Sequence, residues 1–200
     1  NYSLSSNGEK RGNENYSGIG ITGIGVGWGT RLKWPDDYFS TYIEGSYQYY
    51  DVRNYGSIFS FADGYSNNIA AKFVLSRNSI QGNPIYPSGG SKFTLTAKAT
   101  LPYSLWDGID DYSDVDEQVK NKYTEYYKVK FTGEWYLPLT KDKKLMLVPR
   151  FGFGFLGAYS KSKGVSPFER FYYGGSGLTG FRLAGREYIA LRGYDDNSIS

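Results

Sequence analysis

The stretch FTLTAKATL, from Phe93 to Leu101, has a strict period of two. Its odd-numbered positions are all apolar, whereas its even-numbered positions hold three threonines and Lys98. Successive side chains of a β-strand point to opposite faces, so this pattern predicts a strand with one apolar and one polar face. The same rule holds from Tyr127 to Leu139, where helical spacing would scatter the lysines into the apolar face.

Weaker versions of this alternation recur along the chain and predict an all-β protein with seven strands and no helix. From Tyr16 to Thr30, glycine alternates with apolar residues, and the change of parity across Thr22 and Gly23 predicts a β-bulge. The predicted strands span residues 16–30, 41–50, 69–77, 93–101, 127–139, 145–157 and 168–173.

The connections between the predicted strands alternate in length. Those at 31–38, 78–91 and 140–144 are short, those at 51–68 and 102–124 are long, and 158–167 is intermediate. Tight turns on one rim and extended loops on the other are typical of outer-membrane barrels. The longer strands also match the roughly 9–11 residues that cross a bilayer at a tilt. We therefore favour an antiparallel, up-and-down transmembrane β-barrel.

Aromatic residues near the predicted strand ends support the membrane interpretation, because aromatic girdles lie at the headgroup level of a bilayer. A soluble β-sandwich that acts as a binding module is the alternative, since one wet sheet face produces the same alternation. The aromatic residues in question are Trp28, Trp34, Tyr38, Phe39, Trp135 and Tyr136.

The composition excludes several classes of function. The 200 residues contain no Cys and no His, so thiolate or imidazole catalysis and the usual zinc and iron–sulfur sites are excluded within the chain. We expect no enzyme activity, no cofactor and no metal site. The net charge of +3 is small and the basic residues are dispersed, which gives no support to nucleic-acid binding. No apolar run reaches the roughly 18 residues that a membrane-spanning helix needs.

Charged residues fall on the polar parity of the predicted strands, and a barrel would direct them into its lumen. Such a lining suits a pore and equally suits a wall that holds an inserted loop, so transport and assembly stay open here. The predicted lumen-facing residues are Glu44, Lys72, Lys98, Lys128, Lys130 and Glu134.

Two further patterns have simpler explanations. Gly18, Gly20 and Gly23 have the spacing of a dinucleotide-binding loop, but no helix follows them. We expect these glycines to let a loop approach the wall closely. The acidic residues between 107 and 117 could bind a hard cation, but their spacing matches no EF-hand loop, and we expect a solvated extracellular loop.

Two stretches carry a resemblance to a known family. PFERFYYGG, residues 167–175, precedes a segment with Leu191, Arg192, Gly193 and Tyr194. Upstream, LSRNSIQGNPIYPSGGSKFTLTAKATLP (75–102) is similar to a strand, turn and strand unit. Together they resemble the BamA family of outer-membrane assembly factors. In that family a Phe/Tyr-rich segment with a Gly pair precedes the sixth extracellular loop, whose tip carries Val-Arg-Gly-Phe/Tyr.

The chain departs from the family pattern at two points. Leu191 replaces the valine of the motif, and an earlier near-copy at 178–181 lacks the arginine. The resemblance implies a sixth loop at about 176–200 with its motif at Leu191, Arg192, Gly193 and Tyr194. It implies a loop approach formed by Phe168, Glu169, Arg170, Phe171, Tyr172, Gly174 and Gly175.

The resemblance also implies architecture and function. Residues 1–200 would be part of one transmembrane domain, a barrel of about 16 strands, with periplasmic soluble domains and further strands elsewhere. Arg192 would pair with an acidic wall residue, and Gly193 would permit a tight backbone approach. The implied function is insertion of β-barrel proteins into the bacterial outer membrane, with lipids, accessory lipoproteins and unfolded clients as partners. A porin or two-partner secretion channel is the alternative.

Overall fold

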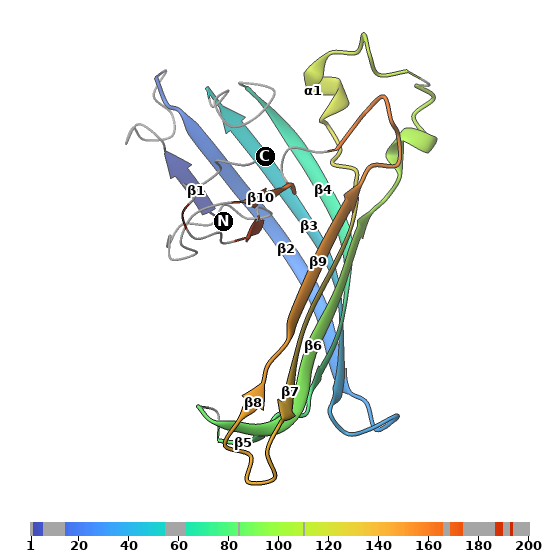
Figure 1. Cartoon of the computed structure of the whole chain (residues 1–200). Helices are drawn as coiled ribbons and strands as arrows, with labels where there is room; N and C mark the ends of the chain where they lie inside the picture. Colours follow the sequence, from blue (N-terminus) through green and yellow to red (C-terminus); the bar gives the residue numbers. More distant parts are fainter. Residues whose placement is uncertain are drawn as a thin grey trace.

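The computed structural model describes residues 2–5, 15–54, 63–83, 85–109, 111–165, 169–173, 187–189 and 193. Most of them belong to long strands, which Figure 1 shows side by side as one tilted, curved wall. No helix in these ranges is long and apolar enough to cross a membrane. In chain order the elements are β1 (Tyr2–Ser5), β2 (Gly18–Arg31), β3 (Phe39–Arg53), β4 (Gly64–Asn78), β5 (Gln81–Gly82), β6 (Pro87–Thr100), η1 (Tyr103–Leu105), α1 (Glu117–Lys120), β7 (Tyr127–Pro138), β8 (Met146–Leu147), β9 (Arg150–Gly157), β10 (Phe171–Tyr173) and β11 (Glu187–Ile189).

The wall is one sheet in the order β1-β2-β3-β4-β6-β7-β8, with β5 paired to β6 and β9 paired to β7. Every pair in it is antiparallel. The strands β2, β3 and β4 have 14, 15 and 15 residues, which is long enough to cross a bilayer. The predicted all-β, up-and-down architecture is confirmed, and the wall strands form a single sheet rather than the two layers of a sandwich.

The two rims of the wall differ as the connection lengths predict. Figure 1 shows tight turns at the lower end of the strands and longer connections, including η1 and α1, at the upper end. We call these ends the turn side and the loop side. The one-turn helices lie within the long connection 102–124, where the sequence patterns predicted no helix. Asp116 caps α1 by accepting a hydrogen bond from the backbone N–H of Gln118.

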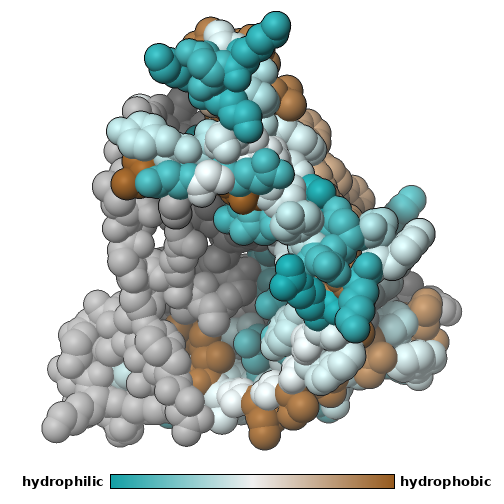
Figure 2. All heavy atoms as spheres, turned by 90° about the horizontal axis from the view of Figure 1, so that it is seen from below, coloured by the Kyte–Doolittle hydropathy of each residue, from teal (hydrophilic) through white to brown (hydrophobic). Residues whose placement is uncertain are grey.

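The two faces of the wall differ in chemistry. Cross-strand partners share a face, and Glu44, Lys72, Lys98 and Lys128 are successive partners across β3, β4, β6 and β7. We call their face the inner face and the opposite one the outer face. Figure 2, a view from the turn side, shows hydrophobic side chains along much of the lower and right-hand margin. Exposed apolar residues of the outer face include Ile24, Val26, Trp28, Ile43, Phe73, Phe151, Phe153 and Phe155.

The parity change in β2 is not a bulge, and that prediction is wrong. The pairing of β2 with β3 continues in register across Thr22 and Gly23. Ile19 and Ile21 therefore lie on the inner face, where they are buried together with Tyr50. Along β2 the inner face is thus apolar and packed near the loop side and glycine-rich nearer the turn side. Parity in a sequence cannot distinguish an inserted residue from such a change in surroundings.

Residues 169–173, the described part of the segment predicted as a seventh wall strand (168–173), are not part of the wall. Within them, β10 pairs in parallel with β11 in a separate two-stranded sheet, and Figure 1 shows β10 apart from the wall strands. The side chain of Glu169, just before β10, contacts lysines of the inner face. The segment therefore crosses the inner face instead of pairing with the edge of β9.

The loop-side edge of β4 is covered by the connection 101–126. The backbone N–H of Asn67 donates to the carbonyl of Lys122 at 2.9 Å, and that of Thr124 donates to the carbonyl of Asn67 at 2.8 Å. The side-chain amide of Gln118 accepts from the backbone N–H of Tyr65 and donates to its carbonyl. These contacts satisfy backbone groups that lie beyond the part of β4 paired with β6.

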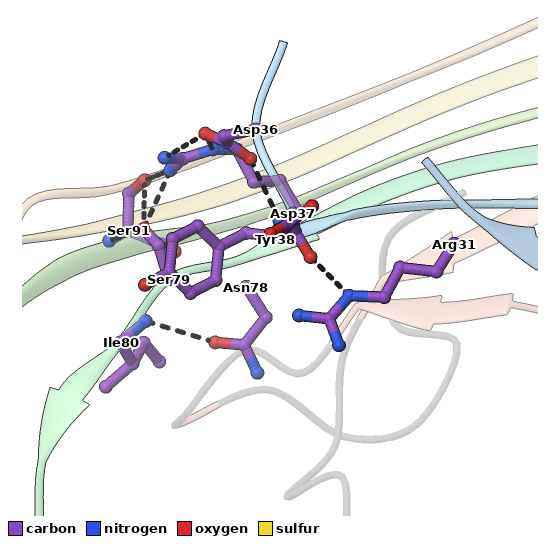
Figure 3. Close-up of polar contacts among 9 residues, drawn as sticks. Arg31, Asp36, Asp37, Tyr38, Asn78, Ser79, Ile80 and Ser91 are labelled. Carbon is purple, nitrogen blue, oxygen red and sulfur yellow. Dashed lines mark hydrogen bonds and ion pairs between the residues drawn. The ribbon is translucent and has the colours of Figure 1, made fainter. Parts of the chain in front are cut away.

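On the turn side, Arg77 of β4 ties three parts of the chain together. Its Nε and Nη2 donate to Oδ2 of Asp36 at 3.0 and 2.8 Å. Its Nη1 donates to the hydroxyls of Ser79 and Ser91 at 2.7 and 2.6 Å, and Figure 3 shows these groups converging. The hydrogen bonds from Arg77 lower the pKa of Asp36. The guanidinium thereby fastens the β2–β3 turn to β4 and β6.

A pair of neighbouring substitutions tests the assignment of the two faces. Leu95 and Thr94 lie near the middle of β6 and point to the outer and inner face. Leu95→Arg should lower the free energy of unfolding by about 2–4 kcal/mol, because it places a charge in hydrocarbon, whereas Thr94→Arg should have a much smaller effect. Urea titration of the full-length protein in liposomes, followed by gel mobility before and after heating, measures both. Equal losses would contradict the assignment.

The Asp36–Arg77 contact predicts a pH dependence. Because the pKa of Asp36 is lowered in the folded state, the contact stabilises the protein above the unfolded pKa of about 3.9 and is lost as pH falls through the lower, folded value. Asp36→Asn should therefore be less stable than the wild type near neutral pH, and the gap should close in acid. Thermal unfolding of the full-length protein measures it. Asp37→Asn is the matched control, because only the backbone oxygen of Asp37 accepts from Arg31.

Candidate functional site

The predicted lumen-facing residues all lie on the inner face. Lys72 lies 3.8 Å from Glu44, with both side chains about a third exposed (35% and 27%). Glu134 lies 3.7 Å from Arg150 of the neighbouring strand β9 and accepts a hydrogen bond from Tyr136. Partly exposed pairs of this kind contribute little to stability, about 0–1 kcal/mol each. The remaining three, Lys98, Lys128 and Lys130, line a cavity of about 370 Å³ together with Glu169.

Glu169 is the centre of this cavity, and its side chain is only 2% exposed. Its Oε1 lies 2.7 Å from Nζ of Lys98 and accepts a hydrogen bond from the hydroxyl of Tyr126 at 3.0 Å. Its Oε2 lies 3.7 Å from Nζ of Lys128, which also donates to the backbone carbonyl of Glu169 at 3.1 Å. One carboxylate therefore binds Lys98 of β6, Lys128 of β7 and Tyr126, the residue just before β7. We call this group the glutamate latch.

The residues around the latch explain why the chain can approach the wall here. Gly154 of β9 lies on the inner face, and a Cβ at this position would lie 2.7 Å from the ring of Phe171. The absence of a side chain thus lets the end of the Phe171 ring approach the backbone of the wall closely. Nζ of Lys128 lies 4.5 Å from the centre of the same ring, within cation–π range. The glycine, the aromatic ring and the ion pairs hold residues 169–171 on the inner face.

The energetics of the latch depend on its completeness. Removing two or more charges from water is expensive, and their mutual attraction offsets that loss only where the geometry is good. Here Glu169 carries one negative charge against two lysines, whose side chains are 19% and 9% exposed. Removing the carboxylate takes away the counter-ion that Lys98 and Lys128 share, which costs about 3–5 kcal/mol in a fully buried pair.

A second buried ion pair holds the same segment on the loop side. Nζ of Lys163 lies 2.9 Å from Oε1 of Glu125, and the two side chains are 8% and 2% exposed. Glu125 also accepts hydrogen bonds from the backbone N–H and the hydroxyl of Ser104. Lys163 lies over the ring of Tyr112, whose pKa is raised by burial and by its hydrogen bond to Asp107. We call the pair of Lys163 and Glu125 the loop-side clamp. Glu125 is adjacent in sequence to Tyr126 of the glutamate latch, so neighbouring residues take part in both attachments.

The chemistry available at the site is electrostatic attachment. Within the described ranges, no group of three or more Asp and Glu side chains is placed to hold a metal ion. The carboxylates of the acidic loop instead bind groups of the same loop. Asp107 accepts a hydrogen bond from the hydroxyl of Tyr112, and Asp111 accepts one from the hydroxyl of Ser113. Ammonium and hydroxyl groups line the inner cavity and suit a bound carboxylate, which the chain itself supplies.

The other predicted site residues fall into two groups. Leu191, Arg192, Tyr194, Phe168, Gly174 and Gly175 lie outside the described residues, so their predicted roles stay predictions. Gly193 is described: its φ of +87° favours glycine, and a Cβ there would meet nothing within 4 Å. This backbone conformation favours glycine, and the tight approach predicted for Gly193 stays a prediction. Arg170 is exposed, and Nη2 donates to the carbonyl of Val165 at 3.4 Å.

Comparison with known proteins agrees with this architecture. The model of the Omp85 superfamily domain matches residues 1–200. The chain belongs to the Omp85 superfamily. The Omp85 chain is also similar in fold to BamA from Haemophilus ducreyi lacking POTRA domains 1–3, with a TM-score of 0.61 and 19% identity. The match covers 93% of this chain and 32% of that protein, so the Omp85 chain spans about a third of its length.

Several residues of the site had no signal in the sequence. Glu169 lies in the stretch PFERFYYGG and belongs to the predicted loop approach, but its lysine partners come from strands far along the chain. Tyr126, Glu125 and Lys163 precede or follow the alternating segments, and nothing in their spacing marks them. Gly154 reads as one of several strand glycines. Only the arrangement of β6, β7 and β9 brings these residues together.

Matched glutamine substitutions test the latch. Glu169→Gln keeps the shape of the side chain but removes the negative charge that Lys98 and Lys128 share, so the free energy of unfolding should fall by about 3–5 kcal/mol. Glu44→Gln removes the partner of Lys72 in a more exposed pair and should change it by about 0–1 kcal/mol. Denaturant titration of the full-length Omp85 protein in detergent, followed by tryptophan fluorescence, measures both. Similar losses in the two variants would show that Glu169 does not act as a latch.

Proposed function

We propose that this chain is part of the barrel of an outer-membrane insertase, the central subunit that folds and inserts β-barrel proteins into the bacterial outer membrane. Membership of the Omp85 superfamily and the fold similarity to BamA support this proposal. The partners would be outer-membrane lipids, accessory lipoproteins of the assembly machinery and unfolded client barrels. Catalysis in the chemical sense is not part of the proposed role.

The observation that carries the proposal is that the chain after β9 is attached at two points: Lys163 pairs with Glu125 in the connection before β7, and Glu169 pairs with lysines of the inner face. A passive pore needs an open, hydrated bore. Here the loop-side clamp and the glutamate latch instead hold chain against the wall, with Glu169 and Glu125 both buried. A wall with a fixed internal loop suits a scaffold on which client strands form. By the resemblance, the same loop continues to Arg192, which would pin its tip.

The proposed mechanism is templating of client strands by backbone pairing. An edge strand presents unpaired N–H and C=O groups, and in a membrane these groups favour pairing with an incoming strand. The wall β2–β9 would be the stable part of such a barrel, because its strands are paired over nearly their whole length. The seam between the first and last strands of the whole barrel would be the place where clients pair.

Reconstitution tests the proposal. Liposomes that contain the full-length protein should accelerate folding of an unfolded client barrel, measured by its gel mobility before and after heating. Arg192→Ala should reduce this acceleration toward the rate of empty liposomes, because the loop tip loses its pin. Arg150→Ala is the matched control: Arg150 is 71% exposed beside Glu134, and its loss should have little effect.

The same liposomes separate the insertase from a porin or secretion channel. An insertase whose lumen holds the attached loop should show low ion conductance and high client folding. High conductance together with client folding at the rate of empty liposomes would favour the channel and overturn the proposal.

A further inference from the structure

The outer face has a groove of about 570 Å³ over β2, β3, β4 and β6. Its floor is formed by Gly45, Ala71 and Ala99, which are successive cross-strand partners on β3, β4 and β6. All three positions are exposed. The volume lies in the roughly 300–1,000 Å³ range of small-molecule sites. The larger outer-face side chains that line the groove are Ile24, Val26, Tyr47, Ile69 and Leu101.

Packing within the chain does not explain the glycine in the floor. A Cβ at Gly45 would meet no atom within 4 Å, and its φ is not in the left-handed region. Glycine in a strand interior is destabilising relative to alanine. The inner-face glycines differ, because Tyr42 occupies the space beside Gly27 and Phe171 that beside Gly154. A strand glycine with open space beside it is typical of a place where a molecule outside the chain approaches the backbone.

The loop-side end of the groove is polar and aromatic. The hydroxyl of Tyr47 donates to Oδ1 of Asn67 at 2.8 Å, and Asn67 forms a β-bridge with Tyr123. The ring of Tyr103 stacks on Tyr123 with 4.4 Å between centroids. Nζ of Lys122 lies 5.7 Å from the centre of the Tyr123 ring, and the side chain is exposed. An ammonium group and tyrosines therefore lie beyond the apolar floor.

This order of groups matches one kind of molecule. Hydrocarbon would fill the groove between small floor residues and large rim residues. Tyrosine and tryptophan rings belong at the headgroup level, where Trp106 is 66% exposed beside Tyr103. A lysine at that level attracts an anionic headgroup. We infer that the groove binds an acyl chain of a membrane lipid whose negatively charged phosphate headgroup is bound by Lys122. The inference depends on the proposed membrane location and not on insertase activity.

Native mass spectrometry of the full-length protein in detergent tests this inference, with phosphatidylglycerol as the anionic probe and phosphatidylcholine as the zwitterionic one. The wild type should retain phosphatidylglycerol in preference to phosphatidylcholine. Gly45→Leu places a large side chain in the groove, where a Cβ meets no atom of the chain within 4 Å. It should reduce retention of both lipids to the level of non-specific association. Lys122→Gln should weaken phosphatidylglycerol binding roughly fivefold and leave phosphatidylcholine unchanged.

Ala97→Leu is the control, because Ala97 lies on the outer face of β6 outside the groove and its substitution should leave both lipids bound. Gel mobility before and after heating shows that each variant is folded. Wild-type lipid retention by folded Gly45→Leu, or equal loss in Ala97→Leu, would overturn the groove as the binding site. Equal binding of the two lipids by the wild type would overturn the headgroup preference. Client folding in liposomes reports separately on the insertase proposal.

Discussion

The constraint on which the rest of the structure depends is the pairing of backbone N–H and C=O groups. In hydrocarbon an unpaired group costs several kcal/mol, so a spanning wall must pair each strand along its length. Continuous antiparallel registers from β2 to β9 meet this requirement. On the loop side, β4 extends beyond its pairing with β6, and there Gln118 and residues 122–124 supply the hydrogen-bond partners for the backbone of β4. Side chains are then free to differ between the two faces.

The inner face uses that freedom to hold charge. Buried charges are tolerated where each has a partner, and the glutamate latch and the loop-side clamp both satisfy this condition. The two attachments use adjacent residues just before β7, Glu125 in the loop-side clamp and Tyr126 in the glutamate latch. The path of the loop after β9 is therefore set by residues of β6, β7 and the connection before β7, together with Gly154 of β9. A substitution that displaces residues 125–126 would therefore affect both attachments of the loop, at Lys163 and at Glu169.

The outer face uses the same freedom to meet lipid. Its side chains are mostly large and apolar, so the small residues at Gly45, Ala71 and Ala99 form a local depression in an otherwise even surface. The strands β3, β4 and β6 contribute to both faces of the wall, because successive residues of each strand point alternately to the inner and the outer face. Ser46 points inward beside Gly45, and Lys98 of the glutamate latch precedes Ala99. A bound lipid and the internal loop would thus rest on the two sides of the same thin wall.

The alternation of apolar and polar residues determined the strands and their two faces, because the period of a strand is local and follows from backbone geometry. Connection lengths likewise determined the turn side and the loop side. Other features depend on residues far apart in the chain. The parity change at Thr22 reads as a bulge until burial of Ile19 and Ile21 shows a packed inner face. The segment 168–173 has the composition of a strand, but the partners of Glu169 and Phe171 on β6, β7 and β9 place these two residues on the inner face. Only the tertiary structure could decide the burial of Ile19 and Ile21 and the position of the segment after β9, because ion pairs and close packing are set by spatial neighbours that no local pattern encodes.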